Sequence, residues 1–112
     1  MEERISCKPV EVSDIFKANR RNIYNYTFEV FGGLQADRYL QKIEKALFSL
    51  SVFYAAYPEC RHLATKNQIY RNIILDSHLI IYRITDERVE VLDIMHSASS
   101  IRKVRNIRNI RL

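Results

Sequence analysis

The sequence predicts an α+β domain with the element order β-α-α-β-β-β, in which a helical hairpin packs on a curved antiparallel sheet. Two apolar stripes with steps of three and four residues are joined at Gly32-Gly33, as expected for a pair of amphipathic helices. Three runs rich in β-branched and aromatic residues follow them. At 112 residues, 47% of them apolar, the chain is long enough to bury a core of its own, so we expect one domain over residues 1–112.

The first elements are a strand and a helix. Residues 9–16 alternate apolar and polar side chains over their first half, which is typical of a half-buried strand. Between residues 17 and 31, apolar side chains recur at helical spacing, and the two glycines then end that helix. A longer stripe from Ala36 to Phe53 predicts a second helix that ends before Tyr57-Pro58. Because the link is so short, we expect the two helices to form an antiparallel hairpin.

The three β-rich runs cover residues 69–75, 78–84 and 88–95, and links of hairpin length separate them. The middle run contains four consecutive apolar residues, Leu79 to Tyr82, so we expect that strand to be central and covered on both faces. Residues 59–68 are rich in polar and basic side chains and are expected to form a loop.

The composition limits the chemistry. Cys7 and Cys60 are too few and too far apart for a zinc site or a disulfide framework, so we expect two buried, inert thiols. His62 and His78 have no partner at metal-ligand spacing. No nucleophile motif, glycine-rich phosphate loop or paired carboxylates are found, and we expect neither metal nor cofactor. With no long apolar stretch and no secretory signal, a cytoplasmic location without membrane contact is expected.

The net charge of +5 is concentrated in a basic C-terminal tail, residues 97–112. Apolar and basic side chains each return there at every third position. On an α-helix such a stripe winds by about 60° per step, so it packs poorly against one flat surface. The tail is thus either a helix or an extended segment that orders on an acidic partner, unless it is a solvated end with no role. Its cations are Arg102, Lys103, Arg105, Arg108 and Arg111.

Two stretches of the chain match a known pattern. The first contains Asn22-Ile23-Tyr24-Asn25-Tyr26, Phe31-Gly32 and Gln35-Ala36-Asp37-Arg38-Tyr39-Leu40. The second contains Tyr70-Arg71, His78, Ile81-Tyr82-Arg83-Ile84, Val91 and Ile94-Met95-His96. Together they resemble the ParE-type toxins of the RelE/ParE superfamily. The chain departs from the family pattern at Asn19-Arg20, where an acidic residue and leucine are usual. It departs again at Ser97-Ala98-Ser99-Ser100, where a charged cluster is usual.

The resemblance implies a toxin that is encoded beside its antitoxin and forms a hetero-oligomer with it. We expect that antitoxin to be acidic, with a disordered segment that folds over the toxin. ParE-type members poison DNA gyrase and trap it on cleaved DNA, whereas the related RelE branch cuts messenger RNA in the ribosome. A chain that only binds its antitoxin is a third class.

The ribonuclease reading requires a base, an acid and several cations in one place. Its candidates are His96, Arg71, Arg83, Arg61 and Lys66. The structural alternative for the two strand arginines, Arg71 and Arg83, is exposure to solvent or pairing with Glu90 or Asp93. RelE-like nucleases tend to carry an aromatic residue near the C-terminus, and no tyrosine follows Tyr82. We therefore favour a gyrase poison that acts by binding, with the mRNA endonuclease as the alternative.

For a toxin that acts by binding, we expect partner contacts on the basic tail and on the helical hairpin, through Tyr24 and Arg38. The remaining tyrosines on the apolar stripes, Tyr26, Tyr39 and Tyr82, are expected to pack in the core, each with one polar tip, and the ring of Tyr24 is expected to do the same.

Overall fold

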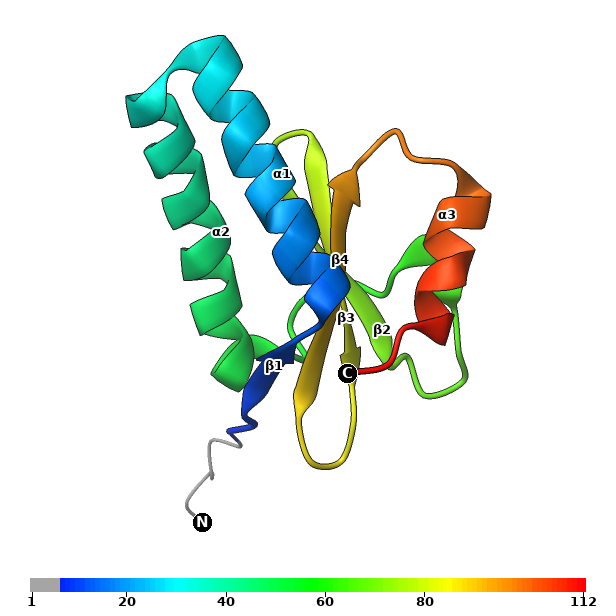
Figure 1. Ribbon diagram of the computed structural model, residues 1–112. Helices are drawn as coiled ribbons and strands as arrows, with labels where there is room; N and C mark the ends of the chain where they lie inside the picture. Colours follow the sequence, from blue (N-terminus) through cyan, green and yellow to red (C-terminus); the bar gives the residue numbers. More distant parts are fainter. Residues whose placement is uncertain (1–6) are drawn as a thin grey trace.

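The computed structural model describes residues 7–112 and confirms the predicted fold class (Figure 1). The elements are β1 (Val10–Val12), α1 (Asp14–Phe31), α2 (Gly33–Phe53), the 3₁₀ turn η1 (Arg61–Leu63), β2 (Tyr70–Leu75), β3 (His78–Ile84), β4 (Val89–His96), α3 (Ile101–Asn106) and the 3₁₀ turn η2 (Ile107–Asn109). The order is therefore the predicted one, followed by a third helix that the tail supplies.

The sheet has the strand order β1-β4-β3-β2. The last three strands in the sequence form an antiparallel meander, but β1 pairs parallel to β4, with Val10 opposite Val89. The sheet is therefore mixed, whereas the sequence predicted it as antiparallel. The parallel direction of β1 relative to β4 could not be predicted, because no hairpin turn connects the two strands. Two helices and two strands lie between them in the sequence.

Helix α1 begins three residues earlier than predicted because Ser13 caps it. The Ser13 hydroxyl accepts a hydrogen bond from the Phe16 amide at 2.9 Å and donates one to the Leu92 carbonyl at 2.5 Å. Residues 14–16, predicted as the end of the strand, are thus the first turn of the helix. The cap fixes the start of α1 on β4.

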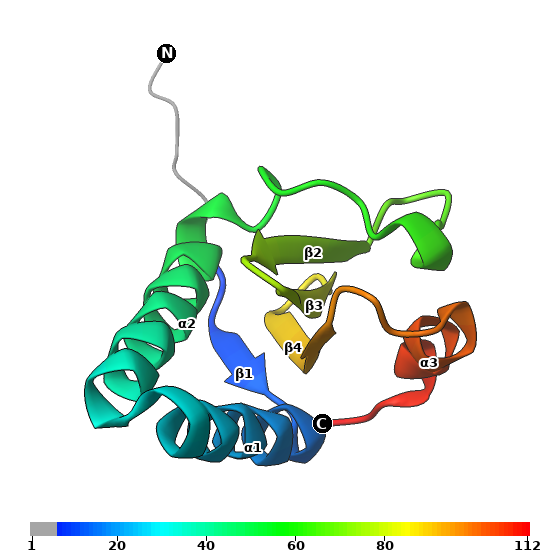
Figure 2. The ribbon, with the colours of Figure 1, turned by 90° about the horizontal axis from the view of Figure 1, so that it is seen from above.

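The two faces of the sheet are covered by different elements, as Figures 1 and 2 show. The helical hairpin of α1 and α2 lies on one face, where Phe16 and Leu50 pack with Ile80 of β3. Leu63 of η1 and Val104 of α3 cover the other face. Strand β3 is central and buried on both faces, as predicted.

The tail is helical and forms part of the core. Ser100 caps α3, and η2 follows directly. A 3₁₀ turn has about three residues per turn, so the change from α3 to η2 lets the three-residue apolar repeat of Val104, Ile107 and Ile110 remain on the sheet side. This change of helix type resolves the misfit that the repeat would have on a regular α-helix.

Asn19, one of the departures from the family pattern, connects α1 to the sheet. Its side-chain amide donates to a carboxylate oxygen of Asp93 at 2.6 Å, and the Ile94 amide donates to the same oxygen at 2.7 Å. Burial raises the pKa of Asp93, although these two bonds and the charge of Lys103 oppose the shift.

The prediction for the thiols is right for one cysteine and wrong for the other. Cys60 is buried, and burial raises its pKa, whereas Cys7 is exposed because it precedes β1 and lies outside both core clusters. None of the helices within residues 7–112 is long and apolar enough to cross a membrane.

Candidate basic interface

The residues of the ribonuclease reading lie in different parts of the fold. His96 ends β4 next to His78, and the ring centroids of the two histidines are 5.8 Å apart. Arg83 of β3 pairs with Glu90 of β4, and Glu90 lies six residues before His96 on that strand. Since an antiparallel strand rises about 3.4 Å per residue, Arg83 and His96 are separated by roughly 20 Å along β4.

Both strand arginines are engaged by the protein itself. Arg71 donates to the carbonyls of Ala55 at 3.0 Å and Tyr57 at 2.8 Å, which holds the end of the helical hairpin to β2. Arg83 forms an ion pair with Glu90 at 2.7 Å, and its guanidinium also lies over the ring of Tyr70. Arg83 has the role of the structural alternative, with Glu90 as the partner that it named, whereas Arg71 has a structural role that was not predicted, because its partners are backbone carbonyls.

Arg83 and Glu90 stabilise each other's charged form. Burial alone would raise the pKa of Glu90, but hydrogen bonds from Arg83 and Arg88 outweigh it and lower the pKa. Burial likewise opposes the charge of Arg83, and the hydrogen bonds to Tyr70 and Glu90 still raise its pKa. The Arg83–Glu90 ion pair therefore stays charged, and it connects β3, β4 and the tail.

A second polar cluster, Tyr39, His78 and His96, lies at the end of the sheet near the hairpin. The Tyr39 hydroxyl is 2.6 Å from Nδ1 of His78. Burial, helped by the charge of Asp76, raises the pKa of Tyr39 to about 12. Burial and His96 lower the pKa of His78, against the effect of Asp76. No role was predicted for His78, because its contact with His96 depends on strand register.

The predicted hairpin contacts differ in their surroundings. Tyr24 donates from its hydroxyl to Asp37 at 2.7 Å, and this bond joins α1 to α2 and raises the Tyr24 pKa. Arg38 is exposed and lines a groove of about 410 Å³ between the hairpin and the β2–β3 turn. Tyr26 was predicted to lie in the core, but it is 64% exposed, because the hairpin tip projects beyond the sheet (Figure 1). Tyr82 is fully buried, as predicted.

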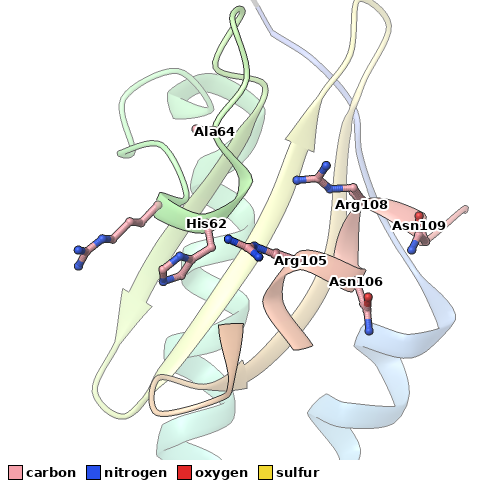
Figure 3. A pocket seen from close by; sticks show the side chains of 7 residues that line it. His62, Ala64, Arg105, Asn106, Arg108 and Asn109 are labelled. Carbon is pink, nitrogen blue, oxygen red and sulfur yellow. The ribbon is translucent and has the colours of Figure 1, made fainter. Parts of the chain in front are cut away.

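A strongly basic concave surface lies on the opposite face, between η1 and the tail. It is an open groove of about 660 Å³, which we call the basic groove (Figure 3). Arg105 and Arg108 reach from the tail toward the side of His62, and Arg61 also lines the groove. Its lining residues are Arg61, His62, Ala64, Arg105, Asn106, Arg108 and Asn109.

The arginines of the groove are free to bind a ligand. Within residues 7–112, Arg61, Arg105 and Arg108 form no ion pair, and their side chains make no hydrogen bond. The other tail cations, Arg102, Lys103 and Arg111, are exposed nearby, and Lys66 is exposed in the η1–β2 loop. The tail and Arg61 were predicted separately as candidate sites, but their proximity is a tertiary contact without a local sequence signal.

The fold is that of small α+β toxins, and comparison with known proteins identifies the class. The family described as ParE toxin of type II toxin-antitoxin system, parDE, matches residues 10–101. The chain belongs to this family and is the toxin of a type II toxin-antitoxin system. Residues 102–112, with all five of the tail cations, lie beyond the match.

One similar solved structure is described as the chromosomal ParDE toxin-antitoxin system from P. aeruginosa. The superposition has a TM-score of 0.68 and covers 81% of this chain and 97% of that chain, at 15% sequence identity. At this identity the similarity shows a common fold. No curated protein sequence matches the chain.

Proposed function

We propose that this toxin is a DNA gyrase poison that acts by binding and is neutralised by a cognate acidic antitoxin. The observation that carries the proposal is the match to the ParE family over residues 10–101, since poisoning of gyrase is the known role of that family. On this proposal the toxin works in the cytoplasm, where gyrase and chromosomal DNA are found.

The placement of the ribonuclease candidates favours binding over chemistry. General acid-base catalysis needs groups within hydrogen-bond reach of one substrate atom. Here Arg71 and Arg83 bind protein carbonyls and Glu90, while Arg61 lines a groove shared with the tail. His96 accepts a hydrogen bond at Nδ1 from the Ala98 amide at 3.0 Å. This contact gives His96 a structural role at the end of β4, which supports binding over chemistry.

We further propose that the antitoxin covers the exposed apolar side chains at the hairpin tip and that its acidic residues reach the tail, forming a hetero-oligomer. Phe31 is 62% and Leu34 is 67% exposed, and large apolar surfaces of this kind mark interaction sites. The net charge of +5 complements an acidic partner. The similar structure from P. aeruginosa is described as a ParDE system, which agrees with such a pair. Residues 97–112 belong to the same domain in this proposal, because Val104 and Ile107 lie in its core.

A pair of assays separates the two target classes. We expect the purified toxin to accumulate cleaved DNA when gyrase, ATP and supercoiled plasmid are all present. His96→Ala should retain most of that activity. The competing reading, a ribosome-dependent mRNA endonuclease, requires cleavage of ribosome-bound mRNA that falls by about 10²- to 10⁴-fold in His96→Ala. That second result, with gyrase unaffected, would replace our proposal.

A further inference from the structure

We infer that the basic groove binds the phosphate backbone of duplex DNA. The inference does not depend on gyrase being the target, because it concerns a direct contact between this chain and DNA. It begins from the groove formed by η1 and the tail, which brings together two basic segments that are more than 40 residues apart in the sequence.

The charge of the groove is uncompensated. No carboxylate lines it, and the three lining arginines are exposed and form no ion pair within the described residues. The acidic residue nearest in the loop, Glu59, accepts a hydrogen bond from the Thr65 amide at 3.2 Å. Arg20 and Arg83, in contrast, each have a glutamate partner. The basic groove therefore presents its full positive charge to solvent, where an anion can neutralise it.

The spacing of the cations suits a repeating anion. Arg105 and Arg108 are three residues apart where α3 passes into η2, so they are separated by about 4.5–6 Å along the axis. Duplex DNA carries one phosphate per strand for about every 3.4 Å of its helix axis, so the two guanidinium groups span between one and two phosphate steps. Arg61 lines the groove from η1, and Asn106 and Asn109, which also line it, carry side-chain amides that can donate hydrogen bonds. Guanidinium and amide groups are the usual partners of phosphate oxygens.

The uncharged lining residues indicate which class of acidic ligand the groove fits: a protein, a single-stranded nucleic acid or a duplex. Protein interfaces need buried aromatic or aliphatic anchors, and Ala64 is the single apolar side chain in this lining. Grooves for single-stranded nucleic acid stack the bases on aromatic residues, and no Phe, Tyr or Trp lines this groove. A polar, strongly basic and open groove fits the outside of a duplex, where phosphates are reached without unstacking a base.

The direct test is binding of the purified toxin, without antitoxin and without gyrase, to a labelled 20-base-pair DNA duplex, followed by fluorescence anisotropy. Three arginine-phosphate contacts predict a salt slope of about −2.7, so a rise from 50 to 200 mM NaCl should weaken binding about 40-fold. In the double variant Arg105→Gln/Arg108→Gln, one contact should remain and the same salt change should weaken binding only about 3- to 4-fold.

The matched control removes the same charge elsewhere. Arg21 and Lys45 are exposed on the helical hairpin and form no ion pair among the described residues, so Arg21→Gln/Lys45→Gln should keep the wild-type slope. Equal slopes in the two double variants would mean that only net charge matters and would overturn the inference. Tighter binding to a single strand of the same length, or displacement of the duplex by poly-glutamate at equal charge concentration, would overturn it as well. Thermal melting of each variant shows that the fold is intact.

Discussion

The guanidinium of Arg83 donates a hydrogen bond to the carbonyl oxygen of Ile110 at 3.1 Å, and this bond fastens the end of the tail to the sheet. The same guanidinium pairs with Glu90, so one side chain connects β3, β4 and the residue after η2. The tail is thus attached at both ends: the Ser100 cap fixes its beginning and Arg83 fixes its last turn.

We expect Arg83→Ala to destabilise the fold by about 1–3 kcal/mol, because it removes a partner from the buried Glu90 carboxylate and from the Ile110 carbonyl. Amide hydrogen exchange should accelerate in residues 101–110. The comparison variant is Arg88→Ala, whose side chain is 38% exposed, and its cost should be about 0–1 kcal/mol. Urea unfolding measures both, and equal losses would show that Arg83 has no special role in holding the tail.

A second prediction concerns the core contact of the tail. Ile107 is 2% exposed and Ile101 is 48% exposed, although both belong to the same three-residue repeat. Ile107→Ala should lower the free energy of unfolding by about 2–5 kcal/mol, as expected for a buried isoleucine. Ile101→Ala should change it by less than about 0.5 kcal/mol. Similar small effects in both variants would indicate that the tail does not pack on the sheet in solution.

The helical hairpin and the three-stranded meander were predictable because their signals are local. Apolar spacing, Gly32-Gly33 and the short links between strands each act within a few residues. The parallel pairing of β1 with β4 and the conformation of the tail were not predictable in the same way. The three-residue repeat could be recognised in the sequence. The conformation that accommodates it, an α-helix that continues as a 3₁₀ turn, depends on packing against a sheet face formed by Ile81 and Leu92.

The site was partly predictable for the same reason. The tail cations were identified from composition, and Arg61 was identified as a basic loop residue. The basic groove that they share required the packing of η1 against α3. Conversely, Arg71 was a candidate for chemistry on the sequence alone, whereas in the structure it donates hydrogen bonds to the carbonyls of Ala55 and Tyr57.

A third prediction is a pH dependence of stability that comes from His78. Its pKa is lowered in the folded protein, so below about pH 6.5 the unfolded chain binds a proton that the folded chain resists. The stability contribution of neutral His78 is fully present above that pH and is lost as the pH falls toward the lowered pKa. His78→Asn should therefore flatten the stability profile between pH 7 and pH 5. An unchanged profile would show that His78 does not determine the pH dependence.

The last prediction follows from the proposed antitoxin and separates charge from apolar contact. Deleting residues 101–112 would be a poor test of the tail, because it would also uncover Ile81 and Leu92. Arg102→Gln/Arg111→Gln removes only exposed charge outside the basic groove. Attraction between exposed charges is screened over a Debye length of about 8–10 Å at physiological salt, so this variant should flatten the salt dependence of antitoxin binding.

The companion variant Phe31→Ser/Leu34→Ser removes exposed apolar side chains from the hairpin tip and leaves the charge unchanged. Burying a leucine- or phenylalanine-sized side chain contributes about 1.5–3 kcal/mol, so losing both should weaken the complex at least tenfold at low and high salt alike. Calorimetric titration of toxin with antitoxin at 50 and 300 mM NaCl gives both quantities for each variant. If the tail variant keeps the wild-type salt slope while the hairpin variant binds normally, the antitoxin uses neither surface, and its binding site must be sought elsewhere on the fold.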